Sequence, residues 1–117
     1  MLTYWLMLRF LGHYSMAKAA VLSMTKTAAL EYVSDRIRIN AVCPTAVETE
    51  IVQQFINSQP DPEAARNGMV KFNPMVEAMG EICQLSDVTG VVSFLAGPDA
   101  RFVNGQSIAI DGGYSIQ

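Results

Sequence analysis

The order of helix-like and strand-like segments along the chain is the feature that most constrains its fold. Residues 15–33, SMAKAAVLSMTKTAALEYV, contain no Gly or Pro, and their apolar side chains recur at helical spacing, which predicts one long helix. Residues 36–44, RIRINAVCP, come next, and Ile37, Ile39 and Ala41 alternate onto one face. This second segment therefore predicts a strand that Pro44 ends.

The rest of the chain continues the alternation. Ser86 and Asp87 offer N-cap oxygens for a further helix, and Gly97 follows its last turn. The expected elements after Pro44 are a loop and a short amphipathic helix at 45–58, turn and helix-start signals at 59–68, a helix at 86–95, a strand at 108–110 and a turn at 111–113.

Helices that alternate with strands in this way are typical of crossover units in a parallel sheet. Only two strands are visible in the sequence, whereas parallel strands are normally buried on both faces of a larger sheet. We therefore expect an α/β fold, and we expect the chain to be the C-terminal part of a doubly wound parallel sheet whose N-terminal strands are missing.

Composition excludes several classes of function. Half of the 117 residues are apolar and 16% are charged, as in a buried globular segment. The net charge is −3, and the 8 Lys and Arg residues form no basic cluster of the kind that binds nucleic acid. Residues 1–12, MLTYWLMLRFLG, lack a basic start and a cleavage site, and they are too short to span a bilayer. We expect no nucleic-acid partner, no membrane association and a cytoplasmic location.

The sulfur-containing residues suggest packing roles. Cys43 and Cys83 lie far apart, and His13 is the only histidine that could join them in a metal site. We expect no metal, and two reduced cysteines that pack as small apolar residues in an intracellular protein. The methionines are expected to fill the core and the substrate lid; they include Met16, Met24, Met69, Met75 and Met79.

The short stretch YSMAK places Tyr14 four residues before Lys18. Average composition produces such a pair by chance in roughly one chain of this length in five, so the spacing alone leaves two readings open. In one, Lys18 activates Tyr14 as a chemical group. In the other, the pair is an aromatic residue at a helix start and a solvated lysine.

The surrounding sequence resembles the C-terminal half of the short-chain dehydrogenase/reductase family. The resemblance covers nearly all of residues 13–113 and includes three motifs in order: YSMAKAAVLSMTKTAALEYVSDRIRINAVCP, VETE and FLAGPDARFVNGQSIAIDGG. It implies a Rossmann-like fold and a nicotinamide cofactor, NAD or NADP. It also implies hydride transfer between that cofactor and a small ketone or secondary alcohol.

The resemblance assigns roles residue by residue. Tyr14 matches the catalytic acid/base, and Lys18 matches the lysine that holds the ribose of the cofactor and activates the tyrosine. Pro44, Val47 and Thr49 match the segment beside the nicotinamide. Residues 51–75 match the variable lid over the substrate.

Elementary electrostatics agrees with a Tyr–Lys pair and sets a condition on it. Positions 14 and 18 share one face of a helix, so their polar ends can reach one site. A positive charge about 4 Å from a phenolate stabilises it by about 4 kcal/mol at an effective dielectric constant near 20, but by only about 1 kcal/mol in open water. The pair therefore needs a pocket that excludes water.

The chain also departs from the family pattern. It contains no glycine-rich turn for the cofactor pyrophosphate. The substrate-orienting serine is expected about a dozen residues before Tyr14, where the chain has Met1, Leu2, Thr3 and Tyr4, and Thr3 offers a hydroxyl in its place. Thr45 stands where the family usually has glycine. We therefore divide the chain into an atypical segment, residues 1–12, and the C-terminal half of a dehydrogenase/reductase domain, residues 13–117.

These departures keep further functions open. The chain could be a non-catalytic fragment that acts through subunit association, because missing strands would leave apolar surface bare. It could also be a non-functional remnant that does not fold alone. The family resemblance favours a homo-oligomer.

Overall fold

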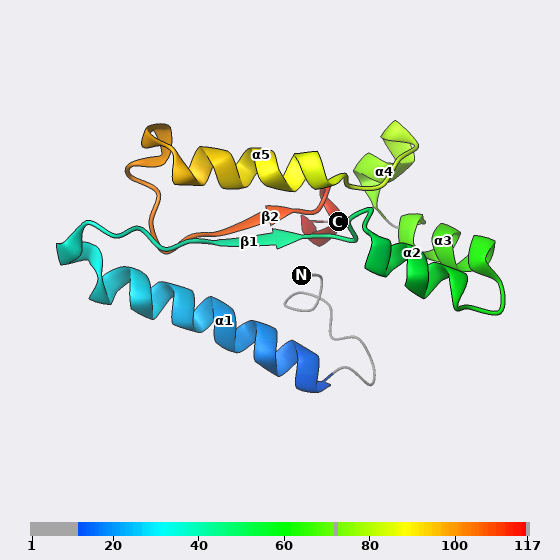
Figure 1. The fold of residues 1–117 in the computed structure, drawn as a ribbon, viewed down its shortest axis with the longest axis horizontal. Coiled ribbons are helices and arrows are strands. Elements are labelled where there is room, and N and C mark those ends of the chain that lie inside the picture. The colour runs from blue at the N-terminus through cyan, green and yellow to red at the C-terminus, as the bar shows by residue number, and fades with distance from the viewer. Residues whose placement is uncertain (1–11, 72, 117) are drawn as a thin grey trace.

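The computed structural model describes residues 12–71 and 73–116, and it is an α/β structure with two parallel strands in that part of the chain (Figure 1). The helices and strands are α1 (Gly12–Glu31), β1 (Ala41–Pro44), α2 (Glu50–Asn57), α3 (Pro62–Val70), α4 (Pro74–Met79), α5 (Leu85–Ala96) and β2 (Ser107–Ile110). Short 3-10 turns lie at Val33–Asp35, Pro98–Ala100 and Tyr114–Ile116. Residues 1–11, which belong to the atypical segment and include Thr3, lie outside the described residues.

The predicted long helix is confirmed as α1, which begins three residues earlier and ends two residues earlier than expected. The chain leaves the helix through the 3-10 turn at Val33–Asp35 and through Arg36, whose φ of 60° lies in the left-handed region. A residue in that conformation cannot continue a right-handed helix. The reversal directs the chain back along α1 toward β1.

The strand β1 is shorter than the sequence predicts. It begins at Ala41 and pairs in parallel with β2, with Ala41 opposite Ser107 and Pro44 opposite Ile110. Pro44 is the last residue of the strand, as expected from its missing N–H group. Before Ala41, the N–H of Ile39 donates to the side chain of Asn104, at Oδ1, at 2.8 Å, while the Ile39 carbonyl oxygen accepts the N–H of Gly105 at 2.8 Å.

A set of polar side chains locks the start of β1 to the segment before β2. The Arg38 guanidinium donates to the carbonyl oxygens of Leu95 at 2.7 Å and Val103 at 3.3 Å. Asn40 donates to the Val103 carbonyl oxygen at 2.9 Å. Asn104 donates to the Ala29 carbonyl oxygen at 3.0 Å and so ties the last turns of α1 to the same place.

The start of α5 corrects one expectation about capping. The N-cap is Gln84 rather than Ser86, and the N–H of Gln84 donates to Oδ2 of Asp87 at 2.7 Å. Asp87 therefore acts from the third helical position, as in a capping box. The short helix α4 has no counterpart among the predicted elements, and its N-cap is the buried side chain of Asn73.

The sheet lies between α5 and α1 (Figure 1). The buried apolar side chains come from α1, α2, α4 and the segments that flank α5, which has none of its own: Leu22, Ala29, Ile56, Val76, Ile82 and Ala100. No large side chain among the described residues is completely buried. Met16 and Met24, on α1, are largely exposed, so the expectation that the methionines fill the core is wrong for these two.

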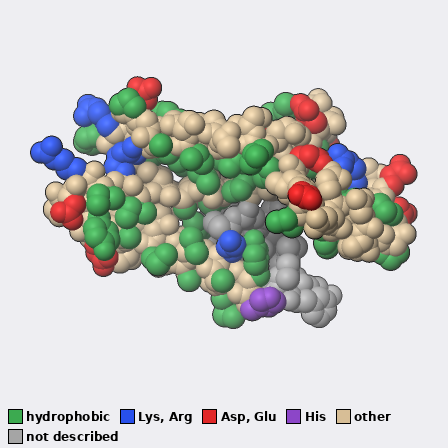
Figure 2. Space-filling view, in the orientation of Figure 1, with side chains coloured by type: hydrophobic (Ala, Val, Ile, Leu, Met, Phe, Trp, Pro, Cys, Tyr) green, Lys and Arg blue, Asp and Glu red, His purple; other side chains and the backbone are tan. Residues whose placement is uncertain are grey.

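The molecule is open for its size. Its accessible surface is 8293 Å², whereas a compact protein of 12.8 kDa exposes about 6,300 Å². Its radius of gyration is 16.0 Å against about 13 Å for a compact chain of this length. Figure 2 shows hydrophobic side chains between α5 and α1 and over α1. No helix in the described ranges is long and apolar enough to cross a membrane.

Candidate active site

The structure places Tyr14 and Lys18 side by side in the first two turns of α1. The Nζ atom of Lys18 lies 5.3 Å from the centroid of the Tyr14 ring, a cation–π distance. Tyr14 is 41% exposed, and Lys18 is half-buried. Because α1 runs antiparallel to β1, these turns lie toward the carboxyl ends of both strands (Figure 1).

The neighbour of Tyr14 is a polar group that sequence reasoning missed. The hydroxyl oxygen of Ser15 is buried and has no hydrogen-bond partner among the described residues. His13, on the other side, is exposed. No spacing or motif in the sequence distinguishes Ser15 from the other small residues of α1, so only the fold identifies it.

The segment after β1 carries the other predicted site residues. Val47 forms an isolated parallel bridge with Cys83, and the N–H of Glu48 donates to the Cys83 carbonyl oxygen at 2.8 Å. Thr49 is the N-cap of α2, where its hydroxyl oxygen accepts the N–H of Val52 at 3.4 Å. Pro44, Val47 and Thr49 thus lie at the end of β1 and in the loop that leads from it to α2.

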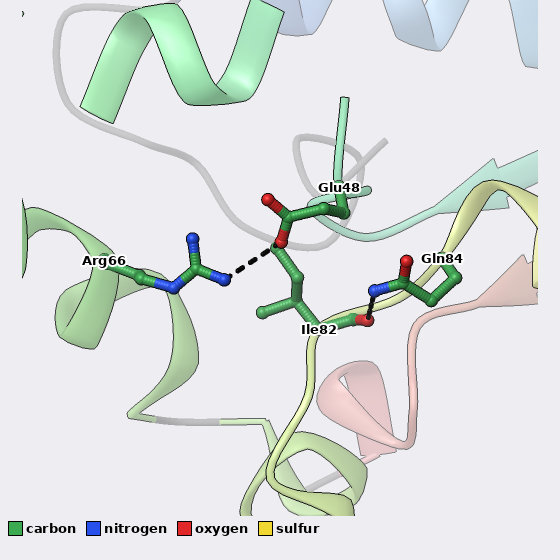
Figure 3. A network of polar contacts seen from close by, with 4 residues as sticks. All are labelled: Glu48, Arg66, Ile82 and Gln84. Atoms are coloured by element: carbon green, nitrogen blue, oxygen red, sulfur yellow. Dashed lines mark hydrogen bonds and ion pairs between the residues drawn. The ribbon is translucent and has the colours of Figure 1, made fainter. Parts of the chain in front are cut away.

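An ion pair outside the predicted site holds this loop. Nη2 of Arg66, on α3, lies 3.1 Å from Oε2 of Glu48, with both side chains partly exposed (Figure 3). Nearby, the Gln84 side-chain amide donates to the Ile82 carbonyl oxygen at 2.9 Å (Figure 3). The ion pair connects α3 to the segment that carries Val47 and Thr49. Local sequence patterns could not indicate it, because its two residues lie 18 positions apart.

Two cavities lie next to the sheet. One, of about 530 Å³, is lined by Thr45, residues 109–113, α4 and the start of α5. The other, of about 540 Å³, lies between α1 and the sheet and is lined by Leu22, Lys26 and Cys43 among others. Neither Tyr14 nor Lys18 lines either of these two cavities.

Both cysteines are free and half-buried. Burial raises the pKa of the Cys43 thiol, and the Asp111 carboxylate raises it further. Burial also raises the pKa of Cys83, with a further increase from Asp87. Within the described ranges, no group of three or more His, Cys, Asp or Glu side chains could hold a metal ion.

Two described side chains carry groups of the kind that binds the nicotinamide end of a dinucleotide. Lys18 offers a half-buried ammonium group, and the hydroxyl of Thr49 keeps its hydrogen free to donate, because its oxygen is the acceptor in the α2 cap. No glycine-rich turn precedes a helix in the described part of the chain, so a place for the pyrophosphate is not found there. The fit is therefore to the nicotinamide end alone.

Comparison with known proteins gives consistent matches. The profile of a family described as Enoyl-(Acyl carrier protein) reductase matches residues 6–115. Dehydrogenase/reductase SDR family member 6 of Aquarana catesbeiana is 34% identical over 103 residues, which cover 88% of this chain and 40% of that protein. Meso-2,3-butanediol dehydrogenase of Serratia marcescens is 38% identical over 102 residues, which cover 87% of this chain and 37% of that protein.

Solved structures agree with the sequence matches. The crystal structure of levodione reductase superposes with a TM-score of 0.79 at 32% identity, covering 89% of this chain and 40% of that one. The structure of ElxO with NADP bound gives a TM-score of 0.74 at 36% identity, and the match covers 89% of this chain and 39% of ElxO. The chain thus spans about 40% of the length of these relatives. The profile match and these relatives show that the chain belongs to the short-chain dehydrogenase/reductase family.

Proposed function

We propose that the protein is an NAD(P)-dependent oxidoreductase that interconverts a small ketone and a secondary alcohol, with Tyr14 as the acid/base and Lys18 as its activator. The observation that carries the proposal is the Tyr14–Lys18 contact at 5.3 Å on the first turns of α1, toward the carboxyl ends of parallel strands. Ligands of open α/β sheets bind at that edge.

The proposed chemistry uses proton transfer by the protein and hydride transfer by the cofactor. In the reducing direction the phenol of Tyr14 donates its proton to the carbonyl oxygen, and in the oxidising direction the phenolate accepts the alcohol proton. The nicotinamide, when bound, supplies or accepts the hydride. The ammonium group of Lys18 stabilises the negative charge that develops on the phenol oxygen.

Exposure sets how strongly Lys18 can act. Because Tyr14 is 41% exposed, water screens its interaction with Lys18. A bound cofactor and substrate would cover the ring and exclude that water, which strengthens the pair. We therefore propose that Tyr14 is activated in the ternary complex.

The proposed cofactor is NAD or NADP, with its nicotinamide end between Lys18 and the segment that contains Pro44, Val47 and Thr49. The relative ElxO, solved with NADP bound, supports a nicotinamide cofactor. Relatives named for butanediol and levodione support small carbonyl or alcohol substrates. We further propose a cytoplasmic homo-oligomer.

The test is turnover by the Tyr14→Phe variant in the presence of NADH or NADPH and a panel of small ketones. Loss of the phenolic proton donor should lower kcat by about 10²–10⁴-fold, while cofactor binding changes little. Tyr32→Phe is the matched control, because Tyr32 is also exposed but lies beyond the far end of α1. Turnover that survives Tyr14→Phe would refute the assignment.

A second candidate function, subunit association without catalysis, is favoured by the excess surface of about 2,000 Å² over a compact chain. A standard interface buries about 800 Å² on each partner, so the excess on this one chain is larger than a stable interface requires. Light scattering at increasing concentration tests it: association is the expected result, and a folded chain that stays monomeric would contradict it.

A further inference from the structure

The cavity of about 530 Å³ is separate from the Tyr14–Lys18 pair. It lies between α4, residues 81–84, the first turn of α5 and the turn after β2. Its volume falls within the range of about 300–1,000 Å³ that is usual for small-molecule sites. The size alone permits a ligand, and the walls and charges restrict which one.

The wall formed by α4 is fixed by Asn73, whose side chain is only 3% exposed. Its amide donates to the Asp111 carbonyl oxygen at 2.8 Å, and its Oδ1 accepts the N–H of Met75 at 3.2 Å. Gly112 packs directly against this contact: a Cβ there would lie 2.5 Å from Asn73 Oδ1. Because α4 and the turn after β2 are joined so closely, the cavity is formed before any ligand arrives.

The lining combines an apolar wall with negative charge. Met75, Met79 and Ile82 supply apolar surface, while Glu81, Asp87 and Asp111 supply three carboxylates. No Lys, Arg or His is among the lining residues.

The three carboxylates differ in their bonding. Asp87 accepts one backbone N–H, from Gln84, and Asp111 accepts two, from Gly113 and Ser115. Glu81 has no hydrogen-bond or ion-pair partner within residues 12–71 and 73–116. The carboxylates of Asp87 and Asp111 are thus held in place by the backbone, and the carboxylate of Glu81 is available to a ligand.

The thiol of Cys83, which also lines the cavity, is sensitive to this charge, since Asp87 contributes to the increase in its pKa. The same potential would repel a phosphate or carboxylate and attract a cation. Charge complementarity therefore selects among ligands that would all fit by size.

We propose that this cavity binds a small organic ammonium ion, with its apolar body against α4 and its charged group directed to Glu81. A body of roughly ten to twenty non-hydrogen atoms matches the volume. The site is independent of the proposed oxidoreductase function, because binding is measured without a nicotinamide cofactor; failure of one leaves the other standing.

Three probes that differ only in their head group test the charge preference: 4-phenylbutylammonium, 4-phenylbutanol and 4-phenylbutyrate. Binding to the full chain is followed by calorimetry and by iodoacetamide alkylation of the two cysteines. Cys83 lines this cavity and Cys43 lines the other one, so Cys43 is an internal control. The ammonium probe should bind at least about threefold more tightly than the alcohol and slow alkylation at Cys83 only.

Glu81→Gln should weaken the ammonium probe by up to about fivefold and leave the alcohol unchanged, because it removes charge and little else. Glu77→Gln, on exposed α4 surface outside the lining, is the matched control and should have no effect. Equal or tighter binding of 4-phenylbutyrate, equal protection of both cysteines, or no binding of the ammonium probe would each overturn the proposal.

Discussion

Replacing Asn73 with alanine should destabilise the structure more than any other single amide deletion near the lid. The change removes the N-cap of α4, which costs about 1 kcal/mol. It also leaves the Asp111 carbonyl oxygen without the amide that now donates to it at 2.8 Å, a loss of about 1–3 kcal/mol for a buried acceptor. The expected loss in the free energy of unfolding is about 2–4 kcal/mol.

Urea denaturation followed by circular dichroism measures this loss. Asn67→Ala is the matched control, because Asn67 is exposed on α3, and its removal should change stability by about 0.5 kcal/mol or less. The stability of Asn73→Asp should lie between the stabilities of Asn73→Ala and Asn67→Ala, since the carboxylate keeps the cap of α4 but cannot donate to the Asp111 carbonyl oxygen. A loss below about 0.5 kcal/mol for Asn73→Ala would refute the role given to this side chain.

Three further predictions concern other contacts. Arg38→Met should lower the free energy of unfolding, measured by urea denaturation, by about 2–3 kcal/mol, because the carbonyl oxygens of Leu95 and Val103 lose a charged donor. Arg38→Lys should lose less stability than Arg38→Met, since lysine restores the charge but not the planar pair of donors. Gly112→Ala should destabilise the chain by more than about 1 kcal/mol, as φ is +61° and the new Cβ meets Asn73; equal thermal stability would contradict the geometry. Burial raises the pKa of both thiols in the folded chain above the ordinary value of 9.0. The contribution of the two thiols to the free energy of unfolding should therefore be constant below about pH 9 and fall as pH rises through the raised pKa values. A double variant, Cys43→Ala with Cys83→Ala, should lose this contribution to the pH dependence.

The elements with strong local signals were predictable from sequence. The uninterrupted helical pattern predicted α1, and the apolar run at 108–110 predicted β2, because both depend on periodicity over neighbouring residues. Gly112 and Gly113, with φ of 61° and 82°, confirm the expected turn after β2.

Features that depend on distant residues were not predictable. The strand β1 is short because Ile39 bonds to the side chain of Asn104, 65 positions away. The helix α4 depends on an Asn73 cap that is itself held by Asp111, and a six-residue helix has little periodicity of its own. The exposure of Met16 and Met24 could not be inferred from their helical spacing, which fits a buried face equally well.

The candidate site shows the same division. The Tyr14–Lys18 contact follows from i, i+4 spacing on a helix, and the structure brings the two side chains together. The buried hydroxyl of Ser15 and the Glu48–Arg66 ion pair depend on tertiary packing and were missed. The roles of Pro44, Val47 and Thr49 beside a cofactor stay predictions.

Transfer of deuterium from deuterated NADH or NADPH to a ketone is the most direct test of the proposed chemistry. The alcohol formed by the wild-type protein should carry the label on its carbinol carbon, and the label should be lost in Tyr14→Phe but kept in Tyr32→Phe. An unlabelled product from the wild type, or an undiminished amount of labelled product with Tyr14→Phe, would refute the proposed hydride transfer assisted by Tyr14.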